Sequence, residues 1–574
     1  MKRGLLILLV LIAGVGICIP VLKSEKLMTW SQGRSVVSSQ GGIVAAEQPL
    51  ASQAGASILA QGGSAADAAI AASATMGLMQ PMMNGMGGDL FAIESDAKSG
   101  KVSGLNASGW APEELTPAYL QSKGLKRIPG TGILSVTVPG CVMGWWELHQ
   151  KFGKLPWKDL FKPAIYYASH GFPIAQWNSM YWPAYANVLD AEAKRVYLPG
   201  GDAPKLGQVF RNPEYAKALE LVAEQGERAF YEGSIAQAIV KTSQELGGVI
   251  QPKDLSEYKA EWVTPIDTDY RGWKVFEIPP NSQGVATLEM LNIMEQFPLS
   301  TYGPESAERY HVEMQAQQLA YADLHRYVGD PRFVKVPVSG MISTQYAKSR
   351  AGLIQLDKAE CNFQPGTPPG TDPNLTNDTP HPGKDTSYLT AVDRDGNIVS
   401  LIQSLAGAFG SGVAVRGYGF ILQNRATGFT LKPGSPDVLA PHKRPFHTII
   451  PAFMEHGNIH IGFGIMRGGN QPLAQAQFVS DIVDYMMNIQ QALEAPRFNK
   501  FGRGGCSYLI ESRVPEQTLV GLSQLGYGLR VVGPFAEFVG GGQAVLHNSA
   551  TGVNNGASDP RKDGEAIPEP SPRE

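Results

Sequence analysis

The pattern of apolar and polar positions changes sharply at residue 386. The stretch before it, Gln364 to Asp385, is rich in Pro and Gly and is poorly suited to packing in a core. The stretch after it predicts a hairpin: a strand over Thr386–Asp393, an Asp-Gly turn within Arg394–Asn397, and a second strand over Ile398–Ser404. The pattern therefore predicts a loop that ends directly at the start of a buried strand.

Helix and strand patterns elsewhere predict an α/β protein. Two Ala-rich helices, at Ala51–Ala60 and Asp67–Met79, carry small residues on many faces, as helices packed closely on a sheet do. The region Glu114–Asp330 is largely helical in pattern, whereas the chain after Ser387 is richer in short strands. The predicted short strands are Asp89–Ile93, Gly419–Gln423, His447–Phe453 and Ile459–Phe463.

The strongest candidate for a domain boundary is Lys358 to Asp385. A structureless loop of this length inside a compact protein is usually functional or disordered. Because strand patterns stand on both sides of it, we interpret it as a processing loop inside one αββα body rather than a linker between independent domains.

Composition predicts a large, well-buried protein that does not bind nucleic acid. The chain has 574 residues, of which 17% are charged and 65 are Gly. Typical domains carry about 25% charged residues and about 7% Gly. The formal net charge is −4, so the chain lacks the basic surface that nucleic-acid binding requires.

The amino-terminal segment predicts export. Lys2 and Arg3 precede the uncharged apolar run Leu5–Leu22, the order found in secretory signals. We predict a signal peptide or signal anchor over residues 1–25, with the folded body periplasmic or extracellular. No clear cleavage site follows the run, which leaves membrane anchoring open, and the bulky Ile17 before Cys18 disfavours lipid attachment.

Cysteines and common motifs indicate no metal and no cofactor. The four cysteines are Cys18, Cys141, Cys361 and Cys506, and they form no C-x-x-C pair. Whether Cys361 pairs with Cys506 stays open at this point. The chain also lacks the G-x-S-x-G, H-E-x-x-H and Walker A patterns.

Thr386 is the strongest candidate for chemistry. If the Asp385–Thr386 bond were cut, one residue would carry both a hydroxyl and a free α-amine, whose unperturbed pKa is roughly 7.7–8.0. That pairing makes a nucleophile with its own general base. Thr is also a common first residue of a strand, so the local sequence by itself favours a purely structural reading.

Several separate blocks decide between these readings, because the chain resembles the γ-glutamyltransferase (glutathione hydrolase) family of N-terminal nucleophile hydrolases. The similarity extends over roughly Gly41 to Ala566. The blocks that carry it are Gly62–Ala69, Asn84–Gly88, Val138–Gly140 with Gly153–Trp157, Ala320–Asp323 with Gly329–Pro331, Asp385–Thr386, Phe409–Gly412 and Asp559–Gly564.

The resemblance implies a four-layer αββα sandwich and a precursor that cuts itself before Thr386. Residues 26–385 would form a large subunit and residues 386–574 a small one, held together as a heterodimer. Thr386 would attack an amide carbonyl and pass the acyl group to water or an amine. Ser404 stands where the family has a supporting hydroxyl, and Gly468-Gly469 matches the glycine pair whose amides form the oxyanion hole.

The binding residues depart from the family pattern. Family members hold the substrate's α-carboxylate with an Arg and a Ser-Ser pair, and the matching positions here are Ser108 and His447-Thr448. The Asp that holds the α-amino group is replaced by Gly428, and a nearby Asn by Ala406. Arg425 is the one added charge, and a guanidinium can grip a carboxylate in two-point fashion. A structural role for Arg425 is an equal alternative.

Three functions follow from this pattern. The first is an exported γ-glutamyl hydrolase or transferase acting on a small-molecule amide. The second is an amidase of the same fold for another acyl group, such as a glutaryl-like acid. The third is an inactive surface-binding relative, which the retained Thr386, Ser404 and Gly468-Gly469 disfavour.

Overall fold

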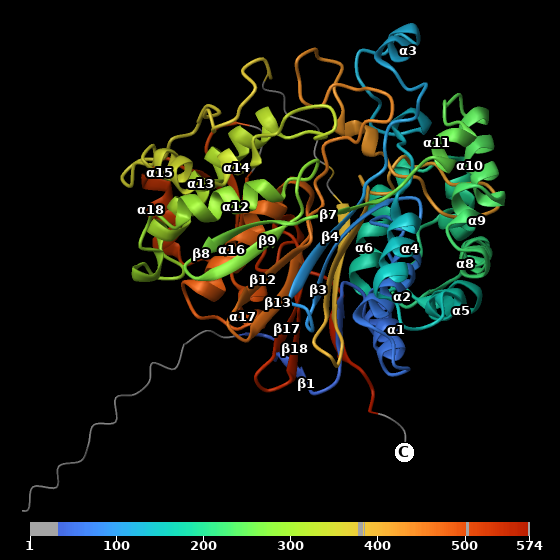
Figure 1. Ribbon diagram of the computed structural model, residues 1–574, viewed down its shortest axis with the longest axis horizontal. Helices are drawn as coiled ribbons and strands as arrows, with labels where there is room; N and C mark the ends of the chain where they lie inside the picture. Colours follow the sequence, from blue (N-terminus) through green and yellow to red (C-terminus); the bar gives the residue numbers. More distant parts are fainter. Residues whose placement is uncertain (1–31, 377–382, 384, 501–503, 572–574) are drawn as a thin grey trace, which may run out of the picture.

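The computed structural model describes residues 32–376, 383, 385–500 and 504–571. Two seven-stranded antiparallel sheets lie face to face, and helices cover the outer face of each sheet (Figure 1). The first sheet has the order β1 (Val37–Ser39), β18 (Val553–Ser558), β17 (Gly542–Asn548), β13 (Ile459–Ile465), β12 (Ala452–His456), β9 (Trp273–Glu277) and β8 (Ile266–Tyr270). The second has the order β19 (Glu565–Pro568), β2 (Ile43–Ala46), β10 (Asp385–Val392), β11 (Ile398–Ala406), β3 (Asp89–Asp96), β4 (Lys101–Ala107) and β7 (Glu261–Val263).

Three apolar clusters account for the four layers. One lies between the sheets and includes Phe91, Tyr388 and Phe453. A second packs α1 (Pro49–Leu59), α2 (Ala65–Met79) and α4 (Cys141–Phe152) on the second sheet. A third packs α12 (Gly284–Met294), α13 (Ala307–Tyr327) and α16 (Gln471–Val483) outside the first sheet. The expected αββα sandwich is therefore confirmed.

Small residues allow the helices of the second sheet to pack closely. A capping box starts α2, in which Ser64 Oγ accepts from the Asp67 amide at 3.1 Å and Asp67 Oδ2 accepts from the Ser64 amide at 3.0 Å. A Cβ at Gly55 would come within 2.8 Å of the Ala68 carbonyl oxygen. The two predicted helices are confirmed, and α2 begins slightly earlier than the sequence pattern indicated.

The hairpin after residue 386 forms as predicted. β10 and β11 pair antiparallel, with Thr390 opposite Ser400. Asp393 Oδ1 accepts from the amides of Asp395 and Asn397, both at 3.0 Å, and Gly396 supplies the positive φ of 87° that the turn requires. β10 lies between β2 and β11 in the interior of its sheet, so its first residues are held on both sides.

Two of the predicted strands were wrong in part or in full. Gly419–Gln423 forms no strand, because its backbone turns against the Asn84–Gly88 segment: the Gln423 amide donates to Gly87 O at 2.9 Å. Only the end of His447–Phe453 joins β12, since the His447 amide donates to Asn281 O instead. The prediction that residues 114–330 are largely helical is confirmed, and short strands that include β7, β8 and β9 interrupt the helices there.

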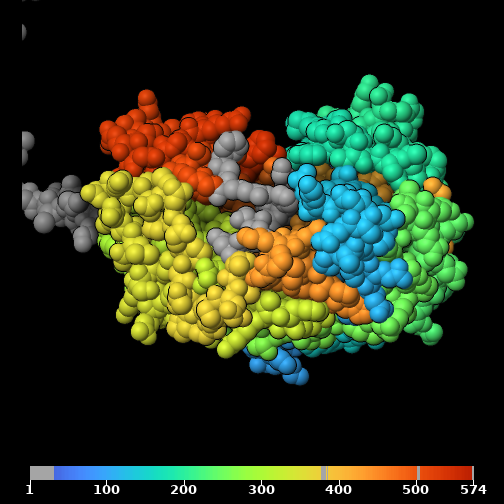
Figure 2. Space-filling view, turned by 90° about the horizontal axis from the view of Figure 1, so that it is seen from above, coloured from blue at the N-terminus to red at the C-terminus, as the bar shows by residue number. Residues whose placement is uncertain are grey.

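The segment before the processing loop is also helical rather than extended. It ends in α15 (Thr344–Ala351), followed by irregular chain up to residue 376. Figure 2 shows this segment in yellow at one end of the sandwich, next to the orange segment that follows β11 and near the light-blue segment around α3 (Pro117–Ser122). Segments from both sides of residue 386 thus meet at this end.

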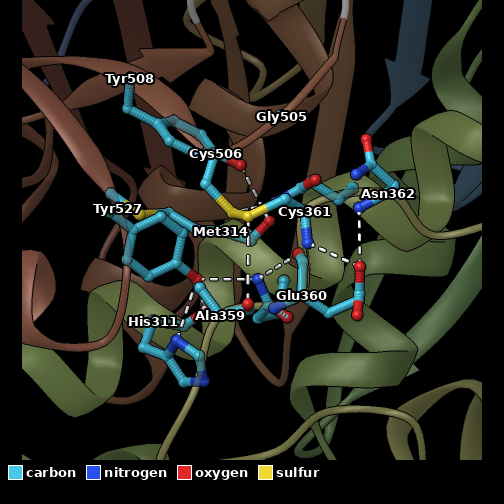
Figure 3. Close-up of a disulfide and its surroundings, with 12 residues drawn as sticks. His311, Met314, Ala359, Glu360, Cys361, Asn362, Gly505, Cys506, Tyr508 and Tyr527 are labelled. Atoms are coloured by element: carbon cyan, nitrogen blue, oxygen red, sulfur yellow. Dashed lines mark hydrogen bonds between the residues drawn. A yellow bond between two sulfur atoms is a disulfide. The ribbon is translucent and has the colours of Figure 1, made fainter.

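A disulfide joins the chain across residue 386. Cys361 and Cys506 are bonded with a Cα–Cα distance of 4.9 Å and a sequence separation of 145 residues (Figure 3). Glu360 Oε1 accepts from the amides of Cys361 and Asn362, both at 2.9 Å, which fixes the backbone on one side of the bond. Cys141 is a buried free thiol. The pairing that the sequence left open is thus present in the structure.

The predicted export segment, residues 1–25, lies outside the described residues. In the ranges that are described, no helix is both long enough and apolar enough to cross a membrane.

Candidate active site around Thr386

Thr386 lies at the start of a central strand and is buried. Its exposed fraction is 1%, as is that of Asp385. The β10–β11 pairing is regular from Ser387 onward, but the register shifts between Asp385 and Ser387. This irregularity leaves Thr386 out of the regular ladder, next to the end of β11. The nucleophile predicted from the sequence is therefore placed where the sheet pairing is locally broken.

Ser404 connects the nucleophile to the bond that it would cut. Ser404 Oγ donates to the Asp385 carbonyl oxygen at 2.7 Å, and it accepts from Thr386 Oγ at 3.1 Å. The Ala406 amide also donates to Ser404 Oγ, at 2.8 Å. Ser404 thus contacts both the carbonyl of the Asp385–Thr386 bond and the Thr386 hydroxyl.

Arg425 is a further hydrogen-bond donor to Ser404. It lies in the short 3₁₀ helix Arg425–Gly428 and is buried, and its Nη2 donates to Ser404 Oγ at 2.9 Å. Its Nη1 donates to Thr448 Oγ1 at 3.1 Å. Burial lowers its pKa to about 10, with Asp89 acting in the opposite direction, so the guanidinium is charged at neutral pH. Arg425 forms no ion pair with a carboxylate in the described part of the chain.

His447 is engaged in a buried pair. Its Nε2 lies 3.0 Å from Asp89 Oδ2, and both side chains are fully buried. Burial lowers the pKa of His447 to about 4, an effect that the nearby Arg425 adds to, so the ring is neutral at neutral pH and its Nε2–H donates to Asp89. Asp89 also accepts from the Gly109 amide at 2.8 Å and from Gln423 Nε2 at 3.0 Å. This pair fixes the segment that carries Thr448.

Ser108 and Gly428 lie beside the same segment without offering a charge. Ser108 Oγ donates to Asn106 Oδ1 at 2.8 Å and accepts from Asn281 Nδ2 at 3.2 Å. Gly428 packs against the backbone of Phe446, where an added Cβ would come within 2.7 Å of the carbonyl oxygen. Neither position supplies the anchors that an amino acid's ammonium and carboxylate would need.

Gly468 and Gly469 present their amides at the start of α16. Neither amide donates to another residue within the described ranges. Their carbonyls are fixed instead, Gly468 O by Gln283 Nε2 at 2.8 Å and Gly469 O by the Tyr321 hydroxyl at 2.5 Å. Gln283 Nε2 also donates to Thr448 O at 2.6 Å, which connects the glycine pair to the Arg425 network. Two free amides at a helix start suit the binding of a developing oxyanion.

The Asp385 side chain marks a part of the site that sequence reasoning missed. Its Oδ1 accepts from the Tyr181 hydroxyl at 3.2 Å and lies 3.6 Å from Arg467 Nη1. Arg467 has a positive φ of 129°, which is rare outside glycine and directly precedes Gly468. Lys562 lies beside Tyr181, and its Nζ is 3.2 Å from the centre of the Trp177 ring. The position of Arg467 before the glycine pair, and of Lys562 inside the block Asp559–Gly564, were the available signals.

The predicted residues therefore separate into two groups. Thr386, Ser404, Arg425 and Thr448 share one continuous network of hydrogen bonds, which reaches Gly468 through Gln283. Ser108, His447 and Gly428 line the backbone of the same region but do not contact Thr386 or Ser404 through any hydrogen bond between described residues. The roles assigned to all of them in substrate binding stay predictions.

A central-strand Thr within an αββα sandwich, with a hydroxyl relay and two free glycine amides, defines an N-terminal nucleophile hydrolase. The family model described as gamma-glutamyltranspeptidase matches residues 51–569. The chain therefore belongs to the γ-glutamyltranspeptidase family.

Proteins named as glutathione hydrolases and proteins named as acylases are both similar to this chain. The Glutathione hydrolase-like YwrD proenzyme of Bacillus subtilis (strain 168) is 34% identical over 541 residues, covering 93% of this chain and 99% of that protein. The Acylase ACY 1 proenzyme of Pseudomonas sp. (strain SE83) is 32% identical over 542 residues, covering 92% and 94%. The crystal structure of cephalosporin acylase from Bacillus halodurans has a TM-score of 0.87 at 37% identity, covering 96% and 100%.

Ser404→Ala should slow cleavage of the Asp385–Thr386 bond by about a hundred-fold or more, the usual effect of removing one donor to a developing oxyanion. Ser404→Thr keeps the hydroxyl and should cleave at close to the wild-type rate. Ser400→Ala is the matched control, because Ser400 is a buried serine of the same strand that contacts Tyr388 and not Asp385. The measurement is a time course of full-length chain on denaturing gels. Equal slowing by the Ser404 and Ser400 variants would contradict the role of Ser404.

Proposed function

We propose that this protein is an exported, self-processing amidase whose acyl group is bound without an α-amino anchor. The observation that carries the proposal is the retained relay from Thr386 through Ser404 to the Asp385 carbonyl, beside a site in which Gly428 and Ser108 supply no charge. Thr386 would serve first as the nucleophile of self-cleavage and then as the nucleophile of substrate turnover.

In self-cleavage, Thr386 Oγ attacks the carbonyl carbon of Asp385. The new C–O bond forms as the C–N bond between Asp385 and Thr386 breaks, and the hydroxyl proton ends on the Thr386 nitrogen. Water then adds to the resulting ester, its hydroxyl to the Asp385 carbon and its proton to Thr386 Oγ. The products are a carboxylate at Asp385 and a free α-amine at Thr386. The short Ser404–Asp385 hydrogen bond supports this order, because it stabilises charge on the carbonyl oxygen.

In substrate turnover, the freed α-amine takes the place of the broken peptide nitrogen. It accepts the proton of Thr386 Oγ as that oxygen attacks the substrate amide, and it gives the proton to the departing amine. Water or an acceptor amine then takes the acyl group from Thr386. The Gly468 and Gly469 amides, which lack described partners, are suited to hold the negative charge on the substrate oxygen.

The missing anchors favour an acyl group other than a free amino acid. An Asp side chain at position 428 would meet the Phe446 backbone, and Ser108 is already bound to Asn106 and Asn281. The likeness to an acylase at 32% identity and to a cephalosporin acylase structure at 37% identity also supports an acyl group other than a free amino acid. A γ-glutamyl hydrolase or transferase is the second candidate, which the likeness to the glutathione hydrolase-like protein favours. The intact relay argues against an inactive relative.

Purified protein should consist of two chains that a disulfide keeps together. Cleavage before Thr386 divides the 61.7 kDa in proportion to 385 and 189 residues, about 41 and about 20 kDa before any signal removal. Because Cys361 and Cys506 lie on opposite sides of the cleaved bond, both fragments should appear only after reduction. The measurement is a denaturing gel with and without reductant, with amino-terminal sequencing of the smaller band.

Two variants separate cleavage from linkage. Thr386→Ala should give one full-length band with or without reductant, because the attacking hydroxyl is gone. Cys361→Ser should cleave normally but give two bands without reductant. A wild-type enzyme that turns over amides as an uncut chain would contradict the proposed mechanism.

The ratio of γ-glutamyl to glutaryl turnover should lie near one. These acyl groups differ only in the α-amino group, and an ammonium paired with a buried carboxylate typically contributes about 1.5–3 kcal/mol, or about ten- to a hundred-fold. Gly428 has no side chain that could supply that carboxylate. The measurement is kcat/KM for the two anilides with cleaved enzyme. A γ-glutamyl preference of a hundred-fold or more would reveal another anchor for the amine.

The disulfide supports export. Structural disulfides persist in oxidising compartments and are rare in the cytosol, and the Cys361–Cys506 bond joins a partly buried cysteine to a buried one, near Tyr508 and Tyr527 (Figure 3). The full-length chain should therefore fractionate outside the cytoplasm, whereas a variant lacking residues 1–25 should stay inside and keep both thiols reduced. Alkylation of free thiols before reduction measures the difference. Recovery of the full-length protein in the cytoplasm with Met1 retained would contradict export.

A further inference from the structure

We propose that the place of the Asp385 side chain becomes a carboxylate-binding subsite after cleavage, formed by Tyr181 and Arg467 with Lys562 behind them. It would select acyl groups that end in a carboxylate. This inference rests on the proposed function and names its substrate class.

The first step is that Asp385 is the chain's own first acyl donor. Its main-chain carbonyl is the one that Thr386 attacks, and its side-chain carboxylate lies two carbon atoms beyond that carbonyl carbon. The group that the site first handles therefore has the carbon spacing of a succinyl group. Its carboxylate accepts from the Tyr181 hydroxyl at 3.2 Å and lies 3.6 Å from Arg467 Nη1. The uncut chain thus displays a carboxylate held at the nucleophile.

The second step is that Asp385 has to leave for turnover to occur. Its carbonyl oxygen holds the Ser404 hydrogen bond, and it covers Thr386, whose exposed fraction is only 1%. Cleavage adds a second carboxylate to a residue that is already buried beside its own side-chain carboxylate. Repulsion between the two charges and the cost of burying both favour departure. A substrate can reach Thr386 Oγ only when this position is free.

The third step is that departure removes one carboxylate from beside Arg467 and Lys562. Arg467 keeps Glu537, whose Oε2 lies 3.0 Å from its Nη1, and this contact holds the guanidinium in place. Lys562 is buried, and its Nζ has no hydrogen-bond partner among the described residues. Burial raises the pKa of Glu47 to about 8, so this neighbour of Lys562 is mostly protonated at neutral pH and compensates little of the lysine's charge. The vacated place is therefore suited to an anion.

Arg425 does not compete for this role through its terminal nitrogens. Its Nη1 and Nη2 donate to Thr448 and Ser404. Arg467 Nη1 instead lies 3.6 Å from Asp385 Oδ1, while it donates to the Tyr181 hydroxyl and to Glu537. We therefore assign Arg425 to positioning Ser404, and Arg467 to binding the substrate carboxylate.

The first experiment compares succinyl, glutaryl and butyryl anilides on cleaved enzyme. Butyryl has the length of succinyl but lacks the second carboxylate. Wild-type kcat/KM should favour succinyl or glutaryl over butyryl by about ten- to a hundred-fold, the usual worth of a charge-assisted hydrogen bond. Arg467→Gln should bring the ratio near one, mainly by raising KM for the succinyl and glutaryl anilides. Arg195→Gln is the control, because Arg195 is an exposed arginine paired with Glu192.

Tyr181→Phe covers the case in which Arg467→Gln blocks cleavage or folding. It removes only the hydroxyl that donates to Asp385 and should lower the carboxylate preference several-fold. A wild-type ratio near one, or a ratio that neither variant changes, would overturn the subsite.

The second experiment measures binding without turnover. Titration calorimetry with succinate should detect binding to the cleaved wild-type enzyme and at least ten-fold weaker binding to Thr386→Ala, in which Asp385 still fills the place. Equal binding to both proteins would overturn the proposal. If cleaved wild-type enzyme hydrolyses none of the anilides, the proposed amidase function fails, and the succinate titration still decides whether the subsite exists.

Discussion

The hydrogen bond from Ser404 to the Asp385 carbonyl is the interaction on which the site depends. It connects the end of β11 to the start of β10, and it closes the gap that the register shift leaves in the sheet. The same hydroxyl accepts from Thr386 and Arg425, so one oxygen holds Thr386, the Asp385 carbonyl and the Arg425 guanidinium together. A central strand is needed for this, because only pairing on both sides holds its first residue to the accuracy that attack requires.

The interleaving of strands explains why a cut chain would stay folded. Both sheets combine strands from before residue 386 with strands from after it, so neither part has a closed core of its own. β10 pairs with β2 on one side, and β19 pairs with the other edge of β2. Separation would expose the cluster between the sheets and the clusters beneath the helices, a cost far larger than the few kcal/mol that a single contact contributes. The Cys361–Cys506 bond adds a covalent link across the same boundary.

Two buried cations, Arg425 and Lys562, lie near Thr386 and Asp385. Arg425 is buried without a carboxylate partner among the described residues, and Lys562 is buried with only an aromatic face against its Nζ. Burying a cation without a partner destabilises a fold. Stability alone would therefore remove both charges. Their position around Thr386 and Asp385 is consistent with a site that binds and polarises acidic acyl groups. The positive φ of Arg467 is also unfavourable for stability, and such strain is commonly found at functional sites.

The sequence by itself pointed to Thr386 as the candidate nucleophile and determined the hairpin that carries it, the two Ala-rich helices and the layered class of the fold. These features are local or repeat along the chain: a Pro- and Gly-rich loop before an alternating strand, a turn at Gly396, and small residues at helical spacing. The family blocks then gave Ser404 and the glycine pair. Only the tertiary structure decided that Cys361 pairs with Cys506, that His447 is paired with Asp89, and that residues 419–423 form no strand. It also brought together Tyr181, Arg467 and Lys562, which lie far apart in the sequence. Such contacts depend on which faces meet after packing, and no local pattern along a single chain records that.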